Sequence, residues 1–149
     1  MRALIQRTSN ASVDIDGVTV GKTTGAGLMI LLCAMDGDTK TEAEFLAGKI
    51  SKLRIFPDEA DRPNLSVKEI GGSALAISQF TLSANWKKGN RPSYITATEP
   101  ELASNLYDYF CEQLILAGVP CEKGVFGASM QVSLINDGPF TIWMDTNDA

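Results

Sequence analysis

Histidine is absent from the 149 residues of this sequence. Its absence excludes the Ser-His-Asp triad, the Cys-His dyad and most zinc sites, and it removes the side chain that enzymes use most often as a general base. We therefore expect no metal ion and no cofactor. If the protein is an enzyme, it works through other groups.

Paired cysteines and long hydrophobic runs are missing too. Cys33, Cys111 and Cys121 are odd in number and far apart, which suits neither a disulfide framework nor a paired-cysteine zinc site. We expect all three to be reduced, with Cys33 and Cys111 in the core. The longest apolar stretch, 28–34, is too short to span a membrane, and the sequence opens without a signal-peptide pattern. These features predict a cytoplasmic protein with no membrane partner.

Positive charge is in the minority, since 13 Lys and Arg stand against 18 Asp and Glu and leave a net charge of −5. Binding to nucleic acid through the overall field of a protein needs an excess of cations. We expect no DNA partner and only local contact with RNA. The clearest basic cluster is Lys87, Lys88 and Arg91, beside Trp86 and Tyr94. Taken alone, such a cluster is most simply a solvated loop.

The composition that is present, 44% hydrophobic and 21% charged, is ordinary for a globular protein. The length suits one domain over residues 1–149. Alternation of apolar and polar residues predicts strands over 3–15 and 18–22, with a tight hairpin turn at Asp16-Gly17. The apolar run 28–34 predicts a strand that is buried on both faces.

Two helices are predicted from capping boxes. Thr39 to Glu42 precedes apolar residues at helical spacing and predicts a helix of about fifteen residues. Thr98 to Glu101 precedes a second helix that ends at Gly118. Further strands are expected at 74–82, 119–126, 130–135 and 140–145, and a loop is expected at 57–64. This order predicts mixed sheets with helices covering one side.

The segment Ser78-Gln79-Phe80-Thr81-Leu82 stands at the end of an apolar strand and is followed by a polar loop. Backbone N–H groups leave the sheet ladder at such a position and become free to hold an oxyanion. A simpler interpretation places Ser78 and Thr81 on an exposed strand face and Phe80 in the core, because short motifs often match by accident.

The segment Asn136-Asp137-Gly138-Pro139-Phe140-Thr141 has a simple interpretation too, as a turn that links two strands. Glycine supplies unusual backbone angles, proline fixes its own, and Asn or Asp closes turns through a side-chain hydrogen bond. A cis bond before Pro139 needs a further reason, since the trans form is preferred by about 0.5–1 kcal/mol.

Together, these two segments resemble the two signature motifs of the D-aminoacyl-tRNA deacylase family. Supporting matches follow in the expected order at residues 1–7, 53–56, 88–93 and 126–132, so the resemblance covers nearly the whole chain. Ser83 and Trp86 depart from the family, which usually has a tyrosine and a small or polar residue there. The departure leaves the details of the loop 83–91 open.

The resemblance implies an α/β fold in which mixed, antiparallel-rich sheets form a barrel-like layer with two main helices on one side. It implies a cytoplasmic homodimer that hydrolyses the ester bond of D-aminoacyl-tRNA, and of glycyl-tRNA mischarged on tRNA(Ala), as proofreading in translation. Gly138 and a cis Pro139 of one subunit would form a main-chain filter in the active site of the other. The filter would reject an L side chain by steric clash.

The resemblance also implies roles for individual residues. Ser78, Gln79, Phe80 and Thr81 would form the reaction centre, where the N–H groups around Phe80 and Thr81 hold the oxyanion and the 2′-hydroxyl of the terminal adenosine acts as base. A nucleophilic Thr81 hydroxyl is the second-ranked mechanism, because a threonine without a nearby base is a poor nucleophile at neutral pH. Binding roles are implied for Arg7, Lys87, Lys88, Arg91, Met130 and Asn136, with Arg7 supporting the Gly-Pro segment and Met130 lining an adenine pocket.

Two other functions fit parts of the sequence. A related deacylase that removes an L-amino acid would use the same scaffold with the Gly-Pro bond in trans. A non-catalytic dimer that binds RNA or protein would use Trp86, Lys87, Lys88 and Arg91 as its platform, but it leaves both motifs unexplained.

Overall fold

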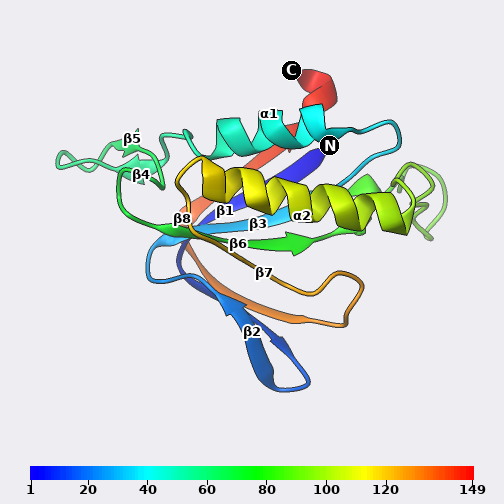
Figure 1. Ribbon diagram of the computed structural model, residues 1–149, viewed down its shortest axis with the longest axis horizontal. Coiled ribbons are helices and arrows are strands. Elements are labelled where there is room, and N and C mark those ends of the chain that lie inside the picture. The colour runs from blue at the N-terminus through cyan, green and yellow to red at the C-terminus, as the bar shows by residue number, and fades with distance from the viewer.

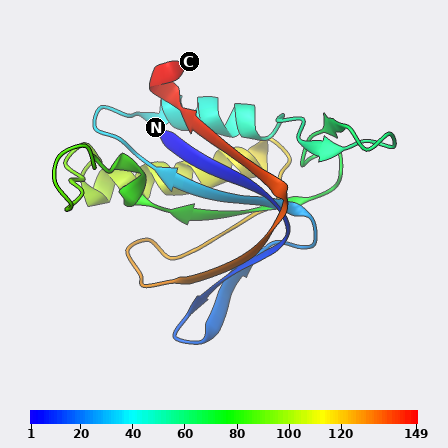
Figure 2. The same ribbon diagram turned by 180° about the vertical axis from the view of Figure 1, so that it is seen from behind.

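Two helices, α1 (Lys40–Ile50) and α2 (Pro100–Leu116), pack side by side on one face of a curved sheet in the computed structural model, which describes residues 1–149 (Figure 1). The opposite face of the sheet carries no helix, as the view from behind shows (Figure 2). The predicted α/β fold, with barrel-like mixed sheets and two helices on one side, is confirmed. Neither helix has the length and apolar character needed to cross a membrane.

The sheet has six strands in the order β2-β1-β3-β6-β7, with β8 on the other edge of β1. Their bounds are β1 Arg2–Ile15, β2 Val18–Lys22, β3 Gly27–Cys33, β6 Ser73–Ser78, β7 Cys121–Lys123 and β8 Gln131–Asp145. The pairs β3–β6 and β6–β7 are parallel, and the remaining pairs are antiparallel. The sheet is therefore mixed and antiparallel-rich, as the sequence predicted.

The long strand β1 organises the sheet, because its first half pairs with β3, its second half pairs with β2, and β8 runs along both halves (Figure 2). The two ends of the sheet also approach each other. The backbone N–H of Lys22 in β2 donates to Glu122 Oε2 in β7 at 2.8 Å. A Cβ on Gly21 would lie 2.9 Å from the carbonyl oxygen of Lys123, so glycine permits this close approach. This approach nearly closes the sheet into a barrel.

Two apolar clusters fill the two faces of the sheet. The larger has 22 buried residues and joins the helices to the sheet, and it includes Phe110 and Leu114 of α2 together with Ile5 and Leu28 of the sheet. Cys33 and Cys111 are buried, as predicted for small core residues. The smaller cluster lies inside the barrel-like curve and consists of Ala11, Val13, Met29, Leu75 and Ile77. The strand β3 contributes to both clusters, which explains its continuous apolar sequence.

The helix ends differ in detail from the predictions. The capping box of Thr39 and Glu42 is present, but α1 has 11 residues and not about fifteen. The cap of α2 is Glu99, whose side chain accepts hydrogen bonds from the first-turn N–H groups, and not Thr98. Pro100 explains this shift, because proline is favoured at the first helical position and so makes the residue before it the cap.

Two predicted strands are wrong in their bounds, and one predicted loop contains strand residues. The strand expected at 74–82 ends at Ser78 and is followed by a 3-10 helix, η1 (Phe80–Ser83). The segment 119–126 contains only the short β7. The segment 57–64, expected as a loop, contributes to a small hairpin of β4 (Phe56–Pro57) and β5 (Pro63–Leu65). The first of these differences changes the geometry of the candidate site.

The strands expected at 130–135 and 140–145 form one strand, β8, and not two strands joined by a turn. Thr8 of β1 pairs with Asn136 and Gln6 pairs with Thr141, so residues 137–140 bulge out of the ladder without a partner in β1. The Gly138-Pro139 segment is therefore a bulge on a continuous strand.

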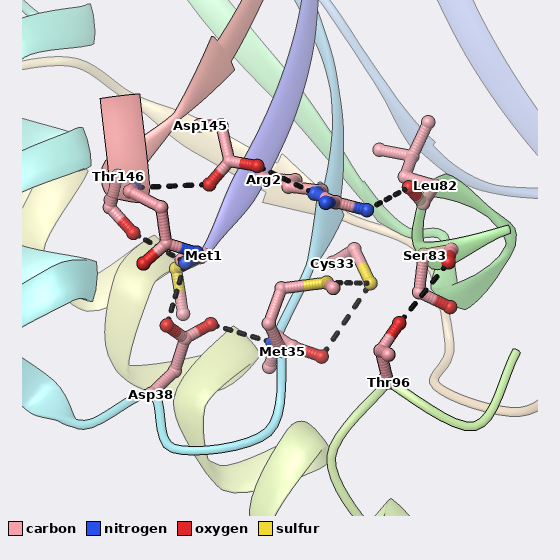
Figure 3. Close-up of polar contacts among 12 residues, drawn as sticks. Met1, Arg2, Cys33, Met35, Asp38, Leu82, Ser83, Thr96, Asp145 and Thr146 are labelled. Carbon is pink, nitrogen blue, oxygen red and sulfur yellow. Dashed lines mark hydrogen bonds and ion pairs between the residues drawn. The ribbon is translucent and has the colours of Figure 1, made fainter. Parts of the chain in front are cut away.

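The two ends of the chain lie beside each other (Figure 1). The N-terminal ammonium group donates to Asp38 Oδ1 at 2.6 Å and to Thr146 Oγ1 at 2.5 Å, and the N–H of Thr146 donates to the carbonyl of Met1 (Figure 3). Asp38 also accepts from the N–H of Met35 at 2.6 Å. These bonds hold the start of β1, the end of β8 and the segment after β3 together.

Candidate active site

A cavity of about 770 Å³ opens where β3 and β6 end, between η1, the start of α2 and the loop before β8. Thirteen of its 19 lining residues are hydrophobic, including Tyr94, Phe126 and Met130. Ser78, Gln79 and Phe80 line it from the first sequence motif. Apolar pockets of about 300–1,000 Å³ with a few polar groups are typical of small-molecule sites, so this cavity can accept a nucleoside-sized group.

The first motif bends sharply out of the sheet at this cavity. Gln79 has φ −143° and ψ 80°, and η1 begins at the next residue. The N–H groups of Phe80 and Thr81 lie in the first turn of η1, where a helix offers them no carbonyl acceptor of its own. The ring of Phe80 is 59% exposed and packs edge-on against Tyr94 at 5.1 Å. Phe80 is thus not the core residue that the simpler interpretation of the motif suggested.

The hydroxyl of Thr81 is held by its own motif. Gln79 Nε2 donates to Thr81 Oγ1 at 2.5 Å, and the N–H of Gln79 donates to the carbonyl of Leu32 at 2.7 Å. An amide that donates to a hydroxyl cannot remove its proton. Thr81 itself is not among the residues that line the cavity.

The titratable side chains around the cavity do not supply a conventional base. Burial raises the pKa of the Cys33 thiol and of the Tyr107 hydroxyl, which keeps both neutral. The Tyr107 hydroxyl donates to the carbonyl of Ala76 at 2.9 Å. The Glu99 carboxylate lines the cavity at its exposed rim and accepts hydrogen bonds from the first turn of α2. Two of these three groups are therefore neutral, and the third is engaged at the start of α2.

The bulge at 137–140 is held by two residues that the sequence singled out. Asn136 Nδ2 donates to the carbonyls of Arg7 and Phe140, and Asn136 Oδ1 accepts from the N–H of Phe140 at 3.0 Å. Arg7 Nε donates to the carbonyl of Asp137 at 2.8 Å, while Arg7 Nη1 donates to the carbonyl of Ile55 at 2.6 Å. The expected contact between Arg7 and the backbone of this segment is present.

Within the bulge, Gly138 and Pro139 are exposed and joined by a cis peptide bond. Gly138 has φ +156°, and a Cβ there would lie 2.5 Å from the backbone nitrogen of Phe140. No other residue fits this position without a shift of backbone. Neither Gly138 nor Pro139 lines the cavity of its own chain.

The third group of predicted residues lies in an exposed loop between the cavity-lining residues Phe80 and Tyr94. Asn85 and Ser93 exchange two backbone hydrogen bonds of 2.8 and 3.0 Å, which close the loop 86–92. Lys87, Lys88 and Arg91 are exposed within it, and Trp86 is 71% exposed. The sequence from Phe80 to Thr98 contains no acidic residue, so the loop is a local positive region in an acidic protein.

The structure thus gathers the predicted residues into three groups: the first motif with Met130 at the cavity, Arg7 and Asn136 around the Gly-Pro bulge, and the basic loop. Sequence reasoning did not find Cys33, Glu99 and Tyr107 at the cavity. Of these, Glu99 had a visible signal, because it directly precedes Pro100 at a helix start. No group of three or more His, Cys, Asp or Glu side chains gathers as a metal site.

Comparisons with known proteins find relatives over nearly the whole chain. Residues 4–145 match the family model described as D-Tyr-tRNA(Tyr) deacylase. A curated protein of Ruegeria pomeroyi, named D-aminoacyl-tRNA deacylase, is 57% identical over 145 residues, which cover 97% of this chain and 99% of the relative. A solved structure named c-Myc DNA Unwinding Element Binding Protein superposes with a TM-score of 0.91 at 37% identity, covering 98% of this chain and 99% of the other. Another solved structure, described as a probable eukaryotic D-amino acid tRNA deacylase, has a TM-score of 0.81 at 19% identity. The alignment covers 96% of this chain and 97% of the other, and it shows that the two proteins share a fold.

Proposed function

The chain belongs to the D-Tyr-tRNA(Tyr) deacylase family and is a hydrolase that acts on the ester bond of D-aminoacyl-tRNA, and from this premise we propose how it cleaves and selects its substrate. The cavity binds the terminal adenosine of the tRNA, and the ester lies at the first turn of η1. The observation that carries this proposal is that Phe80, whose N–H group is unpaired, lines an apolar cavity of nucleoside size, with the unpaired N–H of Thr81 next to it in the first turn of η1.

In the proposed reaction, a water molecule adds to the ester carbonyl carbon and forms a tetrahedral oxyanion. The N–H groups of Phe80 and Thr81 donate to this oxyanion; one such donor is typically worth about 3–4 kcal/mol in the barrier. The 2′-hydroxyl of the adenosine accepts the proton of the water and passes a proton to the 3′-oxygen as the bond between that oxygen and the carbonyl carbon breaks. The products are the free D-amino acid and the tRNA.

Selection is proposed to come from Gly138 and Pro139 of a second copy of the chain. Both residues are exposed and lie outside the cavity of their own chain, and the residues on either side of them are held by Arg7 and Asn136, which supports a role toward a partner. Strand β8 pairs only with β1, which leaves its other edge free, and Ile135 on it is 58% exposed. An apolar, unpaired strand edge favours association with a second copy.

A filter made of main chain would reject L-amino acids because their side chain clashes with it, while nothing in it reads the identity of a D side chain. We therefore propose broad tolerance among D-amino acids. Glycine, which has no side chain, should pass the filter, so glycyl-tRNA(Ala) is a proposed second substrate.

The basic loop is proposed to hold the RNA next to the adenosine through its phosphates. Lys87, Lys88 and Arg91 provide three exposed cations in the loop between the cavity-lining residues Phe80 and Tyr94, and no acidic residue opposes them within the loop. Contacts to phosphates position an RNA without reading its sequence, so the enzyme should act on several tRNAs. The site of action would be the cytoplasm, where charged tRNA is used.

The test is a comparison of deacylation of D-tyrosyl-tRNA, L-tyrosyl-tRNA, L-alanyl-tRNA and glycyl-tRNA(Ala) by the purified protein. We expect release of D-tyrosine and glycine with little release of either L-amino acid. Preferential release of L-alanine would instead identify the related L-specific activity. Binding of tRNA without any release would support the non-catalytic alternative.

The shared site is tested by complementation. A Phe80→Pro subunit lacks an oxyanion donor, and a Gly138→Ala subunit has a distorted filter. If the filter crosses subunits, a mixed dimer contains one site with both defects and one intact site. Co-expression of the two inactive variants should then restore up to half of the parent activity. No recovery in a mixed dimer that is shown to form would contradict a cross-subunit filter.

A further inference from the structure

The carbonyl groups of Phe80, Leu82 and Ser83 in η1 each accept a hydrogen bond from a side chain. The donor to Leu82 is a charged side chain from the start of the chain. Ser83 Oγ donates to the carbonyl of Phe80 at 2.7 Å, and the thiol of Cys33 lies 3.6 Å from the same oxygen. Thr96 Oγ1 donates to the carbonyl of Ser83 at 3.3 Å. Figure 3 shows Cys33, Ser83 and Thr96 gathered around η1.

Leu82 has a carbonyl group near the end of η1, and it accepts a hydrogen bond from Arg2. Arg2 Nη1 donates to this oxygen at 3.0 Å, while Arg2 Nε donates to Asp145 Oδ2 at 2.7 Å (Figure 3). Arg2 and Asp145 are direct partners in the β1–β8 register, so the sheet itself aligns them. One planar guanidinium therefore connects the first strand, the last strand and η1.

The Arg2–Asp145 pair is fixed from several sides. The side chains of Arg2 and Asp145 are only 26% and 8% exposed. The other oxygen of Asp145 accepts from the N–H of Asn147 at 3.1 Å, and the Arg2 guanidinium lies 5.7 Å from the ring centroid of Trp143. Burial would raise the pKa of Asp145, but the hydrogen bonds from Arg2 and Asn147 lower it below its usual value, so the carboxylate stays charged. A fixed anion leaves the guanidinium little freedom to turn away from Leu82.

From this geometry we infer that Arg2, oriented by Asp145, is a positioning residue that sets the direction of η1 and with it the aim of the Phe80 and Thr81 N–H groups at the reacting ester. The inference rests on the proposed role of those N–H groups. Oxyanion donors act only when they are held in place before the reaction, and a supporting shell that fixes them is part of catalysis. Arg2 touches neither the cavity nor a substrate, so its effect must pass through η1.

The experiment compares Arg2→Gln with the matched control Arg62→Gln. Arg62 also faces an aspartate, Asp58 at 3.9 Å, but lies on the β4–β5 hairpin away from η1 (Figure 1). For Arg2→Gln we expect kcat on D-tyrosyl-tRNA to fall at least tenfold while KM stays within twofold. Arg62→Gln should match the parent. Arg2→Lys keeps the positive charge but lacks the planar guanidinium that donates to two acceptors at once. It should therefore recover only part of the kcat that Arg2→Gln loses.

Asp145→Asn tests whether Asp145 acts through Arg2. Asp145→Asn should lower kcat less than Arg2→Gln does. The kcat of the double variant should be no lower than that of Arg2→Gln alone, because Asp145 acts only by orienting Arg2. Activities are measured well below the melting temperature of each variant, so that a loss of stability alone leaves kcat unchanged. An Arg2→Gln enzyme with kcat within twofold of the parent would overturn the inference.

A second readout does not depend on activity. The N–H groups of Leu82 and Ala84 donate to the carbonyls of Gln79 and Thr81 within η1. In Arg2→Gln their hydrogen exchange should become at least tenfold faster, with no change in Arg62→Gln. Unchanged exchange would contradict the role of Arg2 even if the parent showed no deacylase activity. A parent without activity but with faster exchange in Arg2→Gln would refute the proposed function alone.

Discussion

The side-chain amide of Gln79 donates a 2.5 Å hydrogen bond to the hydroxyl of Thr81. This bond restrains the hydroxyl and leaves it without a base, since the amide offers a proton and takes none. The arrangement supports a structural role for the Thr81 side chain, in which it fixes the first turn of η1. Its backbone N–H, rather than its hydroxyl, is then the group offered to the substrate.

Thr81→Ala is therefore expected to keep activity within about tenfold of the parent, which corresponds to roughly 1.4 kcal/mol in the barrier. Single-turnover release of D-tyrosine from D-tyrosyl-tRNA measures it. Thr19→Ala is a suitable control, because Thr19 lies on the exposed β2 hairpin and bonds only to Asp14. A loss of several orders of magnitude in Thr81→Ala would show that the hydroxyl is the nucleophile.

Phe80→Pro and Phe80→Ala form a matched pair for the backbone donor. Both remove a ring that is 59% exposed, but only proline also removes the N–H. Proline fits the first position of a helix, and Gln79 before it is not in a helical conformation, so η1 should still form. We expect kcat of Phe80→Pro to lie about 100-fold or more below that of Phe80→Ala. Equal kcat values would remove the Phe80 N–H from the mechanism.

Gly138→Ala tests the filter. The new Cβ would lie 2.5 Å from the backbone nitrogen of Phe140 at a φ of +156°, so the bulge must shift. We expect at least a tenfold loss of activity on D-tyrosyl-tRNA, with the fold retained and activity on L-tyrosyl-tRNA either unchanged or raised. Gly48→Ala is the control, because it lies within α1 and a Cβ there meets nothing within 4 Å. Unchanged rates on both substrates would mean that this segment does not discriminate between D- and L-amino acids.

The sequence predicted those parts of the fold that depend on local patterns. The alternating strand 3–15, the turn at Asp16-Gly17 and the capping box at Thr39 are present, because side-chain periodicity and turn chemistry decide them locally. The same reasoning extended the strand after residue 73 through the motif, since residues 78–82 contain nothing that breaks a strand. Long-range contacts to Leu32 and Arg2 decide where η1 begins and how it lies.

Candidate site residues were predictable where a motif marked them and hidden where only packing brings them together. Arg7 could be connected with the Gly-Pro segment from the resemblance, and general turn chemistry suggested that an Asn or Asp would close this segment through its side chain. The contact of Arg2 with Asp145 joins residues 143 positions apart, and no periodicity or spacing indicates it. Tyr107 reaches the cavity only because α2 packs over β6, a contact that tertiary structure decides.

The basic loop should control how strongly the enzyme depends on salt. Lys87→Ala/Lys88→Ala/Arg91→Ala is expected to raise KM several-fold with little change in kcat, and to reduce the slope of log(kcat/KM) against log[salt] by up to about 2, since each phosphate contact contributes about 0.7 for a single strand. The control removes three cations elsewhere, in Lys22→Ala/Lys52→Ala/Arg62→Ala. An equal change in KM and in the salt slope in both triple variants would indicate that the overall electrostatic field of the protein acts on the RNA, and not a local contact with this loop. Duplex DNA added as a competitor should inhibit little at physiological salt.

The Arg2–Asp145 pair should also make stability sensitive to acid. The pKa of Asp145 is lower in the folded protein than its usual value of 3.8, because the hydrogen bonds from Arg2 and Asn147 outweigh the effect of burial. The folded state then binds fewer protons than the unfolded state, so the stabilisation is complete above pH 4–5 and is lost as the pH falls through the folded pKa.

Asp145→Asn should therefore cost about 1–3 kcal/mol of unfolding free energy at pH 7, the usual range for losing a partly buried charge-assisted hydrogen bond. The difference from the parent should shrink as the pH falls toward 2, because protonation of Asp145 has the same effect as the substitution. Urea unfolding at a series of pH values measures both curves. Asp108→Asn is the control, since Asp108 pairs with Lys123 where both side chains are about half exposed and the pair is screened by solvent. A constant difference between parent and Asp145→Asn from pH 7 to pH 2 would show that the carboxylate charge does not stabilise the fold.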